Sequence, residues 1–106
     1  MNISEYSFHD ASILEVREFP ENQILEFLIA FPVDWVNNKF EQRILRFNDV
    51  TSYSITQIPF VGNPVILEIE EVQVQSENMN DSSTIEIKTN SGARTIEYVS
   101  CNLISL

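Results

Sequence analysis

The sequence is poor in the residues on which most small catalytic and metal centres depend. Its 106 residues include one cysteine, one histidine and two glycines. The single thiol, Cys101, can form neither an internal disulfide nor a cysteine-based zinc site. Two glycines are too few for a glycine-rich phosphate loop, and the sequence has no G-x-S-x-G nucleophile motif. We therefore expect a protein that is not an enzyme and binds no cofactor.

Long apolar runs are also missing. The longest, residues 27–31, is far shorter than the roughly 20 residues that a membrane-spanning helix needs. Residues 1–6 lack the basic region and the apolar stretch of a signal peptide. A single cysteine suits a reducing compartment. These features predict a soluble, cytoplasmic protein that does not bind membranes.

Basic residues are few, because 6 Lys and Arg stand against 16 Asp and Glu, for a net charge of −10. An acidic surface repels the phosphates of nucleic acids, so we expect no nucleic-acid partner. It attracts a basic protein and accelerates their association. The simpler interpretation is that the charge only keeps the protein in solution.

The sequence does contain many short segments in which apolar and polar residues alternate with the period of a β-strand. We expect one domain over residues 1–106, an all-β antiparallel sandwich or open roll of about seven strands. At most one short helix is expected, near residues 56–63. The predicted strands cover residues 14–17, 23–31, 40–47, 50–58, 65–75, 84–89 and 94–106.

The residue pattern also predicts where some of these segments lie. Segment 23–31 is apolar on both faces, which is typical of a central strand covered on both sides. Segment 50–58 is polar and suits an edge strand. Residues 76–83 should form a solvated hairpin loop, and residues 90–93 contain the glycine that a tight turn needs.

In two predicted strands the apolar residues change from one face to the other. The change falls near Ile44 in segment 40–47 and at Glu70 and Glu71 in segment 65–75. A β-bulge inserts one extra residue and so exchanges the faces of a strand. We therefore predict one bulge at each of these two places.

His9 and Asp10 are the candidate for chemistry, because a histidine beside a carboxylate can act as a general base or a metal ligand. A zinc site with one imidazole would need two or three carboxylates, which is uncommon. In the structural interpretation, which we favour, Asp10 fixes a turn by accepting backbone N–H bonds. We predict no catalytic residue and no metal site. An enzyme or metal-dependent protein that uses His9 and Asp10 is the second interpretation.

Trp35 lies in the predicted loop 33–38 and is the candidate for binding. Aromatic residues in loops are common at the energetic centres of protein interfaces. The alternative, held equal, is that the indole folds back over the edge of the core. The predicted binding residues are Trp35, Asp34, Glu70 and Glu71.

The segment Phe8-His9-Asp10-Ala11, followed by the apolar Ile13, resembles the N-terminal F-H-D-A-x-[IL] signature of a group of small bacterial proteins. That group includes the immunity protein 50 family of polymorphic toxin systems. The resemblance implies a non-catalytic protein that neutralises a toxin by binding it, and the acidic charge implies that the toxin is basic. A third interpretation is a structural subunit, such as a homodimer, that pairs through exposed strand edges.

Overall fold

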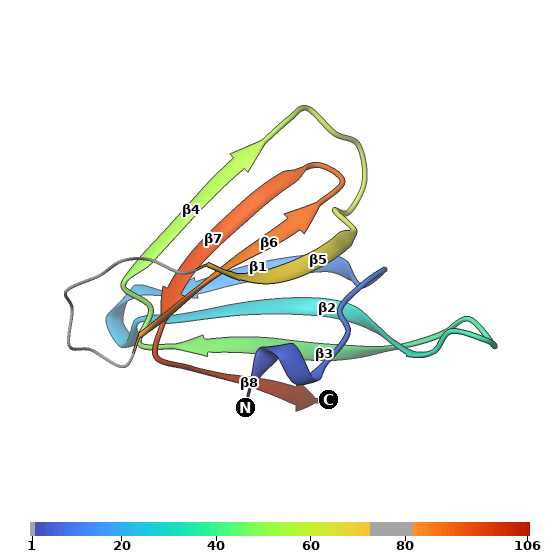
Figure 1. Ribbon diagram of the computed structural model, residues 1–106, viewed down its shortest axis with the longest axis horizontal. Helices are drawn as coiled ribbons and strands as arrows, with labels where there is room; N and C mark the ends of the chain where they lie inside the picture. Colours follow the sequence, from blue (N-terminus) through green and yellow to red (C-terminus); the bar gives the residue numbers. More distant parts are fainter. Residues whose placement is uncertain (1, 73–81) are drawn as a thin grey trace.

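The computed structural model describes residues 2–72 and 82–106, so most of the predicted loop 76–83 lies outside the described residues. It confirms the all-β class, with eight strands in two antiparallel four-stranded sheets (Figure 1). The described residues also form two 3₁₀ helices of three residues each, η1 (Ile3–Glu5) and η2 (Pro20–Asn22). Residues 56–63, where one short helix was expected, are not helical: residues 56 and 57 end a strand, and residues 58–63 are irregular. No helix of the described residues is long and apolar enough to cross a membrane.

The first sheet has the order β1-β2-β3-β8, and the second has the order β4-β7-β6-β5. The strands of the first sheet are β1 (Ser12–Phe19), β2 (Ile24–Asp34), β3 (Lys39–Asn48) and β8 (Ser100–Ser105). Those of the second are β4 (Ser52–Gln57), β5 (Ile66–Val72), β6 (Ser83–Thr89) and β7 (Gly92–Tyr98). The edge position predicted for segment 50–58 is confirmed by β4.

There is one strand more than expected, because the predicted strand 94–106 is two strands. The chain leaves the second sheet after Tyr98 and enters the first at Ser100. The N–H group of Val99 donates to the carbonyl of Asn48 at 3.1 Å, which holds the crossing in place. Tyr98 and Cys101 are both buried although they are three residues apart, because the chain changes sheet between them.

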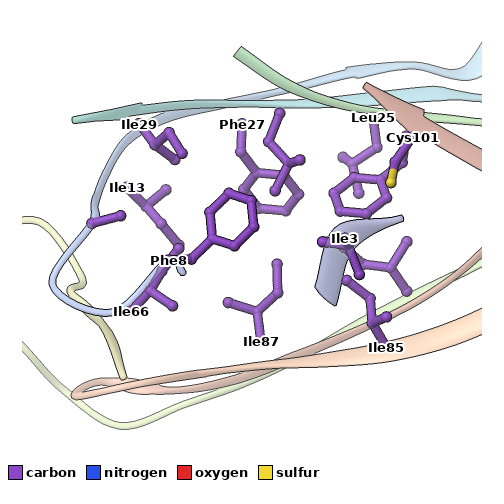
Figure 2. Close-up of a cluster of buried hydrophobic side chains, with 14 of the residues drawn as sticks. Ile3, Phe8, Ile13, Leu25, Phe27, Ile29, Ile66, Ile85, Ile87 and Cys101 are labelled. Carbon is purple, nitrogen blue, oxygen red and sulfur yellow. The ribbon is translucent and has the colours of Figure 1, made fainter. Parts of the chain in front are cut away.

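The core lies between the two sheets, whose buried side chains point toward one another (Figure 2). In β2, the central strand, Leu25, Phe27 and Ile29 are at most 1% exposed. The opposite face of β2 carries Ile24 and Leu28, which are only partly buried. The prediction that this strand is central is therefore confirmed, but cover on both sides is wrong, because the second sheet packs on one face only.

The bulge predicted near Ile44 is wrong. The pairing of β3 with β2 is unbroken from Phe40 to Phe47. Leu45 and Phe47 face the core and are fully buried, while Ile44 lies on the outer face opposite Leu28. The change of parity in this strand reflects two apolar faces and not an inserted residue.

The second predicted bulge exists but is misplaced. The pairing of β5 with β6 runs without a break from Glu68 to Val72, so Glu70 and Glu71 are regular. The register shifts between Ile66 and Glu68, and Leu67, 47% exposed, is the extra residue.

The β6–β7 turn requires a glycine, as the sequence predicted. Gly92 has φ +134°, in the region that favours glycine. A Cβ atom at this position would run into the backbone carbonyl of Thr56 in β4. Gly62, in the β4–β5 loop, also has a positive φ, of +99°, but nothing lies within 4 Å of its Cβ position.

We expect Gly92→Ala to lower the free energy of unfolding by about 2 kcal/mol or more, since it adds a backbone clash to an unfavourable φ. Gly62→Ala is the matched control, because it introduces the unfavourable φ alone and should cost less. Urea unfolding of the two variants measures the difference. Equal losses would contradict the close approach of β7 and β4.

Candidate functional site

Residues 8–11 form a tight turn that leads into β1. The N–H group of Ala11 donates to the carbonyl of Phe8 at 3.0 Å, which closes the turn. Asp10 has φ +72°, a left-handed conformation that Asp tolerates better than most residues. The backbone of Asp10, rather than its carboxylate, fixes the turn, because no described backbone N–H donates to that carboxylate. The prediction that the Asp10 side chain accepts hydrogen bonds from backbone N–H groups is therefore wrong, whereas the prediction that Asp10 lies in a turn is confirmed.

The same turn connects the two sheets. The N–H group of Asp10 donates to the carbonyl of Ile66 at 2.9 Å, and the N–H group of Ile66 donates to the carbonyl of Ala11 at 2.7 Å. Ile13 then donates to the carbonyl of Pro64 at 2.8 Å. These bonds join the start of β1 to the start of β5 across more than 50 residues of sequence.

His9 adds a side-chain bond to this joint. Its Nδ1 atom lies 2.8 Å from the carbonyl oxygen of Leu67, the bulge residue of β5. A carbonyl oxygen can only accept, so Nδ1 carries the hydrogen. Nε2 lies 3.4 Å from Oδ1 of Asp10, and both side chains are more than half exposed. The described residues contain no group of three or more His, Cys, Asp or Glu side chains that could hold a metal ion.

Phe8 and Ala11 belong to the core. Phe8 is 3% exposed and packs edge-on against Phe31, with ring centroids 5.5 Å apart. Ala11 is fully buried, so a larger side chain at this position would need space that its neighbours occupy. His9, Asp10 and Ala11 therefore connect β1 to β5, whereas Phe8 packs in the core.

Trp35 lies at the tip of the β2–β3 hairpin, which extends beyond the body of both sheets (Figure 1). Trp35 is 56% exposed and Val36 is 94% exposed, so Trp35 does not fold back over the core. The carboxylate of Asp34 accepts from the backbone N–H of Asn37 at 3.2 Å and from its Nδ2 at 2.7 Å. The N–H group of Asn38 donates to the carbonyl of Trp35 at 3.2 Å. The exposed aromatic ring thus stands on an ordered turn.

Glu70 and Glu71 are not part of this tip. Glu71 lines a hollow with Tyr98 and Ser100, and Ser100 pairs with the end of β3 that is opposite to the hairpin turn. The Glu70 carboxylate lies 2.9 Å from the Nζ atom of Lys88, whose hydrogen bond lowers the pKa of Glu70. The predicted binding residues therefore do not form one site. Their positions in the sequence do not indicate which ends of the two sheets lie next to each other.

Arg94 was missed at the level of sequence. It is 9% exposed, donates to the hydroxyl of Tyr53 at 2.5 Å and lies over the ring of Phe27, 5.9 Å from its centroid. Burial is the main cause that raises the pKa of Tyr53. The alternation Arg94, Ile96, Tyr98 placed this guanidinium on the inward face of its strand, and that signal could have identified it.

Cys101 is 1% exposed, and its burial raises the pKa of the thiol. A buried thiol that stays protonated is a poor nucleophile. The position of Cys101 is that of a small core residue.

His9→Ala should lower the free energy of unfolding by about 1 kcal/mol, because it removes the bond to the Leu67 carbonyl. Ser7→Ala, an exposed neighbour in the same segment, is the control and should change little. Urea unfolding checks both variants. A stoichiometric metal in the purified protein that is lost with His9→Ala would instead support the metal-dependent interpretation.

Hydrogen bonds from Asn37, first from its side chain and then from its backbone, lower the pKa of Asp34. The bonds favour the carboxylate, so the tip turn should be fully ordered above the ordinary pKa of Asp, about 3.9, and loosen as pH falls through the lowered value. NMR titration of the Asp34 carboxyl carbon measures this pKa. Asn37→Ala should raise it toward the ordinary value, and an unchanged pKa would show that the turn is not ordered as described.

No protein-family model, curated protein or solved structure matches the chain. The likeness of residues 8–11 to the immunity protein 50 signature therefore stays a prediction.

Proposed function

We propose that the chain is a protein-binding domain whose contact surface is centred on the hairpin tip, residues 33–40. The observation that carries the proposal is an aromatic side chain that is 56% exposed on an ordered turn beyond both sheets. Four large apolar residues of the tip are more than 40% exposed: Val33, Trp35, Val36 and Phe40.

The energetics of association favour such a tip. Trp is among the residues that most often carry binding energy at the centre of an interface, because it removes a large apolar area from water. The bonds that Asp34 and Asn38 make fix the turn before any partner arrives. A pre-ordered contact loses less conformational entropy on binding than a flexible one.

A basic protein is the partner that the charge favours. The tip itself is balanced, because Asp34 offsets Lys39. The net charge of −10 belongs to the rest of the chain and acts at longer range, where it accelerates the approach of a basic protein. In this proposal the tip provides the short-range contact and the remaining surface provides the steering.

Neutralisation of a basic toxin in the cytoplasm is the specific form of this function that the F-H-D-A resemblance implies. Such a protein works by covering a surface of its target and needs no catalytic group of its own. The proteins encoded beside this gene are the first partners to test, because the resemblance is to toxin systems.

The decisive experiment measures the binding of purified neighbouring gene products to the full chain and to Trp35→Ala. We expect Trp35→Ala to weaken binding at least ~30-fold, which corresponds to about 2 kcal/mol. Val61→Ser is the matched control, since Val61 is 97% exposed in the β4–β5 loop and outside the tip. The association rate should fall as salt is raised. Equal binding by the chain and Trp35→Ala, or no neighbouring product that binds, would overturn the proposal.

A further inference from the structure

The edge strand β4 presents backbone groups that its own sheet does not use (Figure 1). β4 pairs with β7 on one side, and the N–H group of Ile58 continues this pairing by donating to the carbonyl of Ser91 at 3.0 Å. Backbone groups alternate in direction along an antiparallel strand, so those of Tyr53, Ile55 and Gln57 point away from β7. Within residues 2–72 and 82–106, no hydrogen bond reaches these groups.

The other three edges of the two sheets are protected in ways that β4 is not. Natural edge strands avoid pairing with other chains through charged side chains, bulges or a covering segment. β1 and β5 bind each other at their starts, and each contains a register shift and charged residues. β8 is uncharged, but Ile3 of η1 lines a hollow with Ser100 at the start of this strand. β4 has no charged residue, no proline and no break in its pairing with β7.

We propose that β4 pairs with β4 of a second copy of this chain, in antiparallel direction and about a two-fold axis at Ile55. In this register Ile55 lies opposite Ile55 of the second copy, and Tyr53 lies opposite its Gln57. Each of these pairs exchanges both N–H···O hydrogen bonds. The backbone groups that point away from β7 are therefore the ones that the second copy binds. The axis makes the contact self-complementary, as a dimer of identical chains requires.

The side chains of β4 favour this register. Ile55 is 47% exposed although it lies in the middle of the strand, and pairing would cover it with its counterpart in the second copy. On the outer face, Ser54 of one copy lies opposite Thr56 of the other. Pairs of β-branched side chains and pairs of hydroxyl groups both stabilise neighbouring strands. The contact thus matches apolar with apolar on one face and polar with polar on the other.

Charge favours a second copy over a basic partner at this edge. Residues 52–57 are uncharged in a chain of net charge −10, so they offer a basic protein no attraction. Two copies repel each other over most of their surfaces, and least where β4 meets β4. The nearby acids lie at the start of the strand, since Glu18 lines a hollow with Tyr53 and Glu97 pairs with Ser52. The axis separates the two starts by roughly 14 Å along the strands, which is beyond the Debye length.

Amide hydrogen exchange of the full chain, followed by NMR at micromolar and at millimolar protein concentration, tests the pairing. We expect the N–H groups of Tyr53, Ile55 and Gln57 to become protected as the concentration rises, and those of Ser54 and Thr56 to be protected at both. Sedimentation over the same range should show a monomer that becomes a dimer. Added salt should strengthen the dimer, because it screens the repulsion between two acidic chains. A monomer at millimolar concentration, or edge protection that does not depend on concentration, would overturn the proposal.

Variants at Ile55 test the register. Ile55→Lys places two like charges opposite each other at the axis and should weaken the dimer roughly tenfold. Leu67→Lys is the matched control, since Leu67 is also 47% exposed and lies on the other edge strand of the same sheet. A mixture of the Ile55→Lys and Ile55→Glu variants should restore the dimer, because opposite charges then meet. Equal losses in Ile55→Lys and Leu67→Lys, or no recovery in the mixture, would contradict this register.

The exchange measurement needs no variant, so it decides the outcome if Ile55→Lys does not fold. A chain that stays monomeric, and whose β4 edge becomes protected only when another protein is added, would show that β4 pairs with a strand of that protein and not with a second copy. Trp35→Ala should leave the dimer unchanged. The dimer and the binding of a partner at the hairpin tip can therefore fail independently of each other.

Discussion

The arrangement of the two sheets depends on the hydrogen-bonded joint between the turn of residues 8–11 and the start of β5. Backbone bonds from Asp10, Ile13 and Ile66 connect β1 to β5 there, and the isolated bridge between Ser12 and Val65 continues the contact. Without this joint the sheets would be connected by the β3–β4 and β7–β8 crossings and by side-chain packing. With it, the two edge strands meet at a corner, so the molecule combines features of a sandwich and of a roll. The left-handed backbone of Asp10 and the small side chain of Ala11 let the chain approach β5 closely.

The pattern of the sequence predicted the class and the approximate strands because a period of two survives wherever one face of a strand is buried. The bulge predicted near Ile44 was wrong and the one predicted at Glu70 and Glu71 was misplaced, and both errors have the same physical reason. A change in the face that carries the apolar residues arises either from an inserted residue or from a strand with apolar side chains on both faces. The sequence pattern is the same in the two cases. The partner strand decides between them: β2 stays in register with Ile44, whereas β6 accommodates Leu67 as the extra residue of β5. Only long-range pairing contains that information.

The same limit applies to the candidate sites. A loop with an aromatic residue could be predicted near Trp35, because Pro32 and the two asparagines that follow mark the hairpin turn. The position of Glu70 and Glu71 away from this loop could not be predicted, since it depends on the order of strands in the second sheet. Arg94 is the opposite case. Its alternation with Ile96 indicated that its side chain points inward. That indication was overlooked because charged residues are generally expected to be exposed.

The geometry of β2 indicates that the hairpin tip and the hollow beside Tyr53 are not structurally coupled. They lie toward opposite ends of this strand, which pairs along its length with β1 on one side and β3 on the other. Coupling between distant sites requires an element with two alternative arrangements that both sites bias. A central strand fixed by two ladders, with Phe27 packed edge-on against Phe47 and Tyr53, resists such a change. A change beside Tyr53 would therefore leave the turn that presents Trp35 as it is.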